Sequence, residues 1–161
     1  MAASESLLST GLKKGFAGET QFQTTQRAGF SLQSSHLEES GNTYHDEWAK
    51  ADRITGGQEL VKVGEKIYTR VYAGGTISIE AMEKLGITKK DVMEFLIKCL
   101  NAFAESTRLH ENFGPHREGN WLYQYTVLEK NDAIPMTTGR EEIAYQGQMV
   151  FVHAFVMCPV E

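Results

Sequence analysis

Residues 58–72, QELVKVGEKIYTRVY, decide how this chain folds. β-Branched and aromatic side chains alternate with polar ones on both sides of Gly64-Glu65, which is typical of a β-hairpin. A glycine in the first of the two turn positions suits a type II′ turn, whose twist matches that of the flanking strands. The stretch therefore predicts two antiparallel strands joined at Gly64-Glu65.

A second stretch, residues 142–155, EIAYQGQMVFVHAF, has the same pattern around Gly147-Gln148. An offset of 83 residues carries Glu59 onto Glu142 and Arg70 onto His153. Each hairpin follows a strand pattern that opens with Gly-Asn, at 41–42 and at 119–120. These matches indicate an internal repeat with halves at about 41–76 and 119–158.

The clearest helix pattern, at about 88–109, lies between the two halves. Thr88 and Asp91 form a capping pair that satisfies free backbone donors at its start. Apolar residues then follow with helical spacing and predict one buried face: Val92, Phe95, Leu96, Cys99, Leu100 and Phe103. A shorter helix is expected from Ser78 to Leu85, ended by Gly86, so that residues 78–109 form a helical connection.

The order of strands, helices and strands predicts an α+β fold. We expect duplicated antiparallel β-hairpin units that form a curved sheet, with one long helix (about 88–109) packed across it. A chain of 161 residues fits a single domain, 1–161. Residues 1–40 are poorly defined: Ser6 to Lys14 could form two helical turns, and the polar stretch after them reads as a loop with one or two weak strands.

Composition excludes several classes of protein. The chain is 41% hydrophobic and 23% charged, as globular proteins are, and its net charge of −5 disfavours binding to nucleic acid. The longest apolar stretch, residues 149–157, is too short to span a membrane. The sequence starting at Met1 lacks the features of a secretory signal, and two cysteines are too few for a disulfide framework, so we expect a cytoplasmic protein.

Several motifs resemble a family of small proteins catalogued as a domain of unknown function, number 5680. They are GNTYHDEW at 41–48, GGQEL at 56–60 and VYAGG at 71–75. The second half is similar, with FGP at 113–115, WLYQY at 121–125, GREEI at 139–143 and YQGQMVF at 145–151. The resemblance covers about residues 41–158. It implies a duplicated α+β domain and implies no particular reaction.

Hairpin register provides candidate catalytic residues. Turns at Gly64-Glu65 and Gly147-Gln148 would place Glu59 opposite Arg70 and Glu142 opposite His153, with Cβ atoms about 5 Å apart. A carboxylate beside a histidine orients the ring and raises its basicity, as general acid–base catalysis requires. His153 would then transfer protons, Glu142 would orient it, and Arg70 and Glu59 would hold or polarise an oxygen. The alternatives are a plain cross-strand ion pair and a hydrogen-bonded core pair.

Aromatic side chains alternate along the strands before each hairpin, so that each row shares one face. Such rows form a core or line a pocket for a flat ligand. Asp46 lies in the row of the first half, between Tyr44 and Trp48. It would act as a base or orient a ligand; the alternative is a solvated carboxylate near a turn. The candidate ligand-binding residues are Tyr44, Trp48, Tyr68, Tyr72, Trp121, Tyr123, Tyr125 and Phe151.

Metal and cofactor motifs are weak or missing. His110, Glu111, His116 and Glu118 surround Gly114-Pro115, but their spacing is not that of a zinc site, and a solvated loop after the helix is the ordinary explanation for them. Phosphate-binding and dinucleotide fingerprints and the Gly-x-Ser-x-Gly motif do not occur. We therefore expect no metal and no cofactor.

Two functions remain open. The first is a cofactor-independent acid–base isomerase, cyclase or lyase that acts on a small, partly aromatic organic molecule bound on the sheet face. The alternative is a non-catalytic module, which either carries a small-molecule ligand or forms a homodimer through an exposed hairpin edge.

Overall fold

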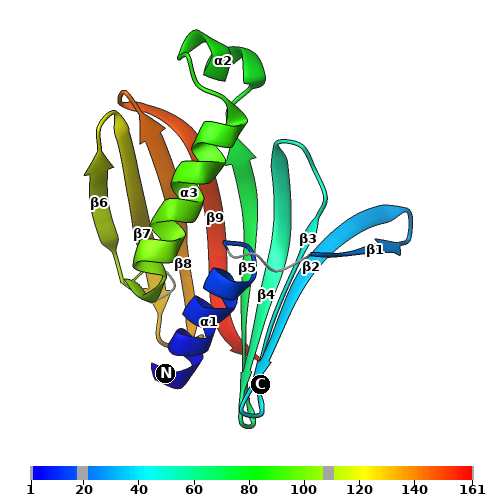
Figure 1. Ribbon diagram of the computed structural model, residues 1–161. Helices are drawn as coiled ribbons and strands as arrows, with labels where there is room; N and C mark the ends of the chain where they lie inside the picture. The colour runs from blue at the N-terminus through cyan, green and yellow to red at the C-terminus, as the bar shows by residue number, and fades with distance from the viewer. Residues whose placement is uncertain (1, 18–21, 107–110, 161) are drawn as a thin grey trace.

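The computed structural model describes residues 2–17, 22–106 and 111–160, which form one antiparallel sheet with helices on one face (Figure 1). Along the chain the elements are α1 (Ala2–Lys14), β1 (Gln23–Arg27), β2 (Phe30–Glu39), β3 (Asn42–Ala49), β4 (Ile54–Val63), β5 (Lys66–Thr76), α2 (Ile79–Lys84), α3 (Lys89–Phe103), a 3₁₀ turn (Ala104–Ser106), β6 (Phe113–Glu118), β7 (Trp121–Asn131), β8 (Met136–Tyr145) and β9 (Gln148–Val160). An α+β fold is confirmed at this level.

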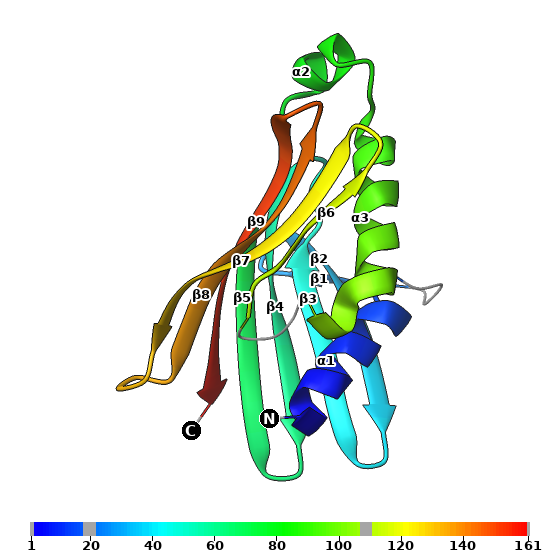
Figure 2. The same ribbon diagram turned by 90° about the vertical axis from the view of Figure 1, so that its left-hand side faces the viewer.

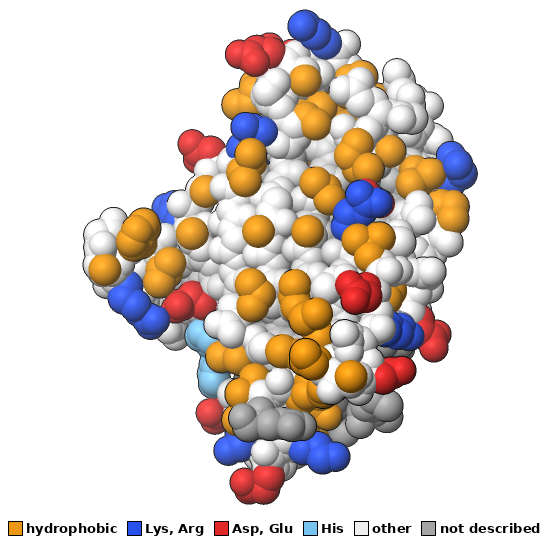
Figure 3. Space-filling view, turned by 180° about the vertical axis from the view of Figure 1, so that it is seen from behind, with side chains coloured by type: hydrophobic (Ala, Val, Ile, Leu, Met, Phe, Trp, Pro, Cys, Tyr) orange, Lys and Arg blue, Asp and Glu red, His pale blue; other side chains and the backbone are white. Residues whose placement is uncertain are grey.

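The strands are ordered β1-β2-β3-β4-β5-β9-β8-β7-β6 across the sheet. Strands that follow one another in sequence are neighbours everywhere except at the centre, where β5 pairs with β9. Figure 2 shows that the sheet is strongly twisted and that α1 and α3 lie on the same side of it. Side chains on that side are therefore enclosed between helices and strands, whereas α1 and α3 leave the other face uncovered (Figures 1 and 2). Figure 3 shows the molecule from that other side, where hydrophobic side chains lie at the surface among polar and charged ones.

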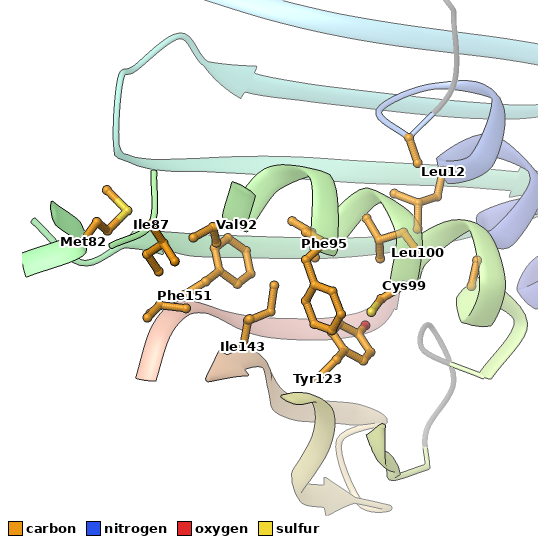
Figure 4. Close-up of a cluster of buried hydrophobic side chains, with 14 residues drawn as sticks. Leu12, Met82, Ile87, Val92, Phe95, Cys99, Leu100, Tyr123, Ile143 and Phe151 are labelled. Carbon is orange, nitrogen blue, oxygen red and sulfur yellow. The ribbon is translucent and has the colours of Figure 1, made fainter. Parts of the chain in front are cut away.

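Two buried clusters hold the helices on the sheet. The larger cluster joins α3 to β7, β8 and β9, and Figure 4 shows Phe95 and Cys99 of the helix facing Tyr123 and Ile143 of the strands. The smaller cluster packs Leu7 and Leu8 of α1 against β3, β4 and β9. Burial of these side chains is the main contribution to stability, as in other globular proteins.

The start of α3 agrees closely with the sequence pattern. The hydroxyl of Thr88 accepts a hydrogen bond from the Asp91 backbone N–H, and the Asp91 carboxylate accepts one from the Thr88 backbone N–H, which is a complete capping box. The regular helix ends at Phe103, and part of the expected 88–109 range, residues 107–109, lies outside the described residues. The expectation of one long helix left out the 13-residue α1, which also packs on the sheet.

The first hairpin has the expected register, with Glu59 opposite Arg70 and Val61 opposite Tyr68. Gly64 has a φ of 58°, as the first position of a type II′ turn requires.

The expected register of the second hairpin is wrong. Its turn residues are Gln146 and Gly147, with φ of 50° and 82°, and two successive positive φ values define a type I′ turn. A β-bulge follows between Ile143 and Ala144. The result is a shift of one residue on β8: Glu141, and not Glu142, lies opposite His153. A shift of one residue places a side chain on the other face of a sheet.

The described residues before β3, 2–17 and 22–40, contain more regular structure than their composition indicates. Residues 2–14 form α1, and β1 and β2 extend the sheet beyond β3. None of the helices formed by the described residues combines the length and the apolar character needed to cross a bilayer.

Candidate functional site

A cavity of about 220 Å³ lies between the sheet and the helices. Strands from both halves of the chain form its floor, and α1 and α3 form its roof. Its polar lining consists mainly of side chains from β3, β4, β5, β8 and β9: Asp46, Glu59, Arg70, Tyr72, Thr76, Glu141 and His153. Its apolar lining includes Leu12, Phe16, Trp48, Met93, Leu96, Leu100 and Phe151. Small-molecule binding sites usually combine apolar walls with a few polar groups that point to the same place.

Glu59 and Arg70 form a buried ion pair at the floor of the cavity. The Arg70 Nη1 atom lies 2.5 Å from Glu59 Oε2, and the two side chains are 2% and 1% exposed. The Tyr44 hydroxyl donates a hydrogen bond of 2.9 Å to Glu59 Oε1. Both carboxylate oxygens are therefore engaged, which is needed when a charge is withdrawn from water. The Arg70 guanidinium also lies 4.7 Å from the centre of the Phe155 ring.

Asp46 and Tyr72 form a second polar pair. The Tyr72 hydroxyl donates to Asp46 Oδ1 at 3.0 Å, and Asp46 is 3% exposed. Burial, together with the negative charges of Asp46 and Glu59, raises the pKa of Tyr72 far above its usual value. Tyr72 therefore remains a neutral phenol that donates to the carboxylate across the physiological pH range.

The second half contributes a related set of groups, Glu141 and His153. The Tyr123 hydroxyl donates to Glu141 Oε1 at 2.6 Å, and Glu141 is 1% exposed. His153 lies directly opposite Glu141 on the neighbouring strand. Its ring lies between two aromatic rings, 4.5 Å from that of Phe151 and 5.3 Å from that of Tyr72. A carboxylate and an imidazole thus line the same cavity.

The predicted partner of His153, Glu142, lies elsewhere. Its Oε1 atom is 3.4 Å from Arg140 Nε, and Arg140 is exposed. Because Glu142 follows Glu141 in a regular part of β8, its side chain points to the face of the sheet without helices. Glu142 is therefore not a cavity residue. Glu141 occupies the position opposite His153 that the sequence pattern assigned to Glu142.

The remaining predicted site residues separate into two groups. Trp48, Tyr72 and Phe151 line the cavity, as do Asp46, Glu59, Arg70 and His153. The other predicted ligand-binding residues lie outside its lining: Tyr44, Tyr68, Trp121, Tyr123 and Tyr125. Tyr44 and Tyr123 hold the two glutamates, as described above.

The three others pack in the core or line a different groove. Tyr125 stacks on Phe155 with ring centres 4.9 Å apart, and Trp121 stacks on Phe95 at 5.1 Å. Tyr68 packs against the smaller cluster and lines a separate groove near the end of β9.

Some cavity residues carry no recognisable sequence signal. Glu141 precedes the glutamate that the repeat pattern selects, and it is the turn type together with the β-bulge that distinguishes the two. Thr76 is 5% exposed, and its hydroxyl has no hydrogen-bond partner among the described residues. The helix residues that form the roof, including Leu96 and Leu100, are indistinguishable in sequence from ordinary core residues.

The histidine and glutamate cluster predicted after α3 lies only partly within the described residues. His110 lies outside the described residues, and the described ranges contain no group of three or more His, Cys, Asp or Glu side chains that could hold a metal ion. Glu118 forms an ion pair with Lys98, and the His116 ring lies 4.7 Å from that of Phe103.

Comparison with protein-family models, curated protein sequences and solved structures finds no match for the chain. The resemblance of residues 41–158 to the family of unknown function therefore stays a prediction.

Proposed function

We propose that the cavity binds a small, partly aromatic organic molecule and that His153 transfers protons on it, with Glu141 orienting the imidazole. The observation that carries this proposal is that Glu59 with Arg70 and Glu141 with His153, one pair from each half, open into one cavity with apolar walls. An imidazole beside a carboxylate can take a proton from one atom of a substrate and return it to another. Isomerisation, cyclisation and elimination all proceed by such transfers.

The other polar groups have supporting roles in this proposal. Arg70, fixed by Glu59, presents a guanidinium that would hold a substrate oxygen. Asp46, which accepts a hydrogen bond from Tyr72, would orient the ligand. Trp48, Tyr72 and Phe151 would contact its apolar part. The volume of about 220 Å³ limits the ligand to a small molecule, below the usual size of drug-binding pockets.

We also propose that the two halves arose by duplication of a unit with one helix and four strands. Equivalent positions in the sheet hold Tyr44 and Tyr123, which donate to Glu59 and Glu141 respectively. The offset is 82 residues from Glu59 to Glu141 and 83 from the facing Arg70 to His153, and the bulge in the second hairpin accounts for the difference. On this proposal the first half keeps a fixed ion pair, whereas the second half carries the titratable base.

The test is an NMR titration of the His153 ring, with and without a library of small aromatic and polyketide-like compounds. We expect a ligand to shift the ring resonances and its titration. Compounds that bind are then incubated with the protein and examined for isomerised, cyclised or eliminated products. Loss of turnover in His153→Ala would support the catalytic role, and full activity in this variant would contradict it.

Glu141→Gln and Glu142→Gln form a matched pair for the same experiment. These neighbours lie on opposite faces of one strand, so only Glu141→Gln should change the His153 titration. Thermal unfolding of both variants separates this effect from loss of the fold. If ligand binds without turnover in the unmodified protein, the carrier function replaces the enzyme.

The dimer alternative receives less support from the sheet edges. The edge strands are β1 and β6. β1 has only five residues, and β6 contains Pro115, which has no N–H to donate to another strand. We therefore favour the cavity over an edge as the functional feature.

A further inference from the structure

The floor of the cavity has an excess of negative charge. Three buried carboxylates, Asp46, Glu59 and Glu141, line it together with one guanidinium, that of Arg70, and with His153. Their formal charges leave a net negative value whether His153 is neutral or protonated. Proteins seldom bury carboxylates unless a positive group or several hydrogen bonds compensate them.

The charged groups at the mouth do not remove this excess. Asp52, Arg53 and Lys89 also line the cavity, but they are exposed, and water and salt screen their charges. Arg53 Nη1 donates to the Thr76 carbonyl at 2.7 Å, and Lys89 Nζ contacts the Asp52 carbonyl. Both cations are therefore directed at backbone oxygens.

The hydrogen bonds to Asp46 and Glu141 come partly from neutral donors. Arg70 Nη1 lies 2.5 Å from Glu59 Oε2, and the phenols of Tyr72 and Tyr123 donate to Asp46 and Glu141 respectively. A phenol lowers the free-energy cost of burying a carboxylate but leaves its charge in place. An ammonium group entering the cavity would supply a charge of the opposite sign.

The walls favour the same type of ligand. Trp48, Tyr72, Phe16 and Phe151 present aromatic rings, whose faces attract cations. The Thr76 hydroxyl lines the cavity, is buried, and has no partner among the described residues. It can accept a hydrogen bond from an ammonium N–H.

We infer that the cavity selects a small organic cation, a protonated primary amine on an apolar or aromatic body. This inference deepens the proposed function, because it rests on the cavity being the ligand site and names the substrate class.

The test compares three ligands of nearly equal shape and different charge: benzylammonium, benzyl alcohol and benzoate. Affinity is measured at pH 7 by calorimetry and by NMR shifts of cavity residues. We expect benzylammonium to bind at least about tenfold more tightly than benzyl alcohol, as one charge-assisted hydrogen bond would provide. Benzoate should bind most weakly.

Equal affinity for the three probes, tighter binding of benzoate, or no binding of any probe would overturn the inference. Binding of benzoate at the cavity would leave the proposed function standing. Failure of all three probes together with a His153 ring that never responds to the wider library would overturn both.

Asp46→Asn and Glu47→Gln provide the matched variants. These neighbours lie on β3 with side chains on opposite faces, and Glu47 forms an exposed ion pair with Arg27. Only Asp46→Asn should weaken benzylammonium binding, by about tenfold, while the affinity for benzyl alcohol stays unchanged. If Asp46→Asn does not fold, Thr76→Val serves instead, with a smaller loss expected for the same probe. An unchanged preference for the cation in the folded variant would contradict the inference.

Discussion

The ion pair between Glu59 and Arg70 is almost completely withdrawn from solvent, so loss of either partner should lower the stability of the sheet strongly. We expect Glu59→Gln to lower the free energy of unfolding by about 3–5 kcal/mol, because it leaves the Arg70 charge buried without its anion. Urea unfolding measures this change. Lys98→Met, which breaks an exposed ion pair with Glu118, is the control and should cost about 1 kcal/mol or less. Equal losses in the two variants would contradict a specific cost of burying the charge.

Cys99 allows a second prediction at the residue scale. Burial, and then the negative charge of Glu141, raises the pKa of its thiol to about 12. In the folded protein Cys99 should resist alkylation at pH 8, whereas the partly exposed Cys158 reacts. Mass spectrometry after iodoacetamide treatment, with and without denaturant, distinguishes the two sites. Rapid labelling of Cys99 in the native protein would show that α3 opens readily.

The same shift predicts a pH dependence of stability. A thiol with a raised pKa in the folded state contributes its full stability below the pKa of the unfolded state, near 9. That contribution is lost as the pH rises towards 12, because only the unfolded chain releases the proton. Cys99→Ala should therefore reduce the decline in stability above pH 9, which urea unfolding at a series of pH values measures.

At the scale of elements, the turn between β8 and β9 controls which glutamate enters the cavity. Gln146 has a positive φ of 50°, which a residue other than glycine adopts at some cost in energy. Asparagine is favoured at the first position of a type I′ turn before glycine. Gln146→Asn should raise the free energy of unfolding by up to about 1 kcal/mol without moving the register. Loss of the His153 response to ligand in this variant would show that the register had changed.

The two hairpins show what local sequence can and cannot predict. Gly64 is the first turn residue, so the pattern located the turn and placed Glu59 opposite Arg70. Gly147 is the second turn residue, and nothing in Gln146 signals a left-handed conformation. The bulge after Ile143 adds an irregularity that alternation does not encode. The pattern therefore pointed to His153, which lines the cavity, but paired it with Glu142, whereas Glu141 is the residue opposite it.

The α3 helix was predictable because its cap and its apolar spacing are local features. The roles of the strand tyrosines were not predictable, because alternation indicates on which face a side chain lies but not which group its hydroxyl contacts. Tyr44 and Tyr123 lie on the expected face, yet each donates to a glutamate from a different strand. Pairings between distant elements decide such contacts.

At the scale of the whole molecule, the pairing of β5 with β9 joins the two halves. Ten register pairs, from Ile67 opposite Val160 to Thr76 opposite Phe151, connect segments about half a chain apart. We expect Ala154→Pro to abolish cooperative unfolding, because it places a ring without an N–H in this central strand. Thr25→Pro, on the exposed edge strand β1, is the control and should cost much less. A cooperative Ala154→Pro variant with an intact cavity would contradict this role of the pairing.

On the proposed function, the central pairing also determines when the ligand site is complete. Arg70 and Asp46 are synthesised early, but His153 joins them only after β9 has emerged and entered the sheet. Contacts between distant segments form slowly, since a long loop must close before they contribute. A nascent chain can therefore hold helices and the first hairpin while the cavity is incomplete. A ligand of the proposed kind would add its binding free energy to that late pairing, and would stabilise the complete sheet over shortened or misfolded products.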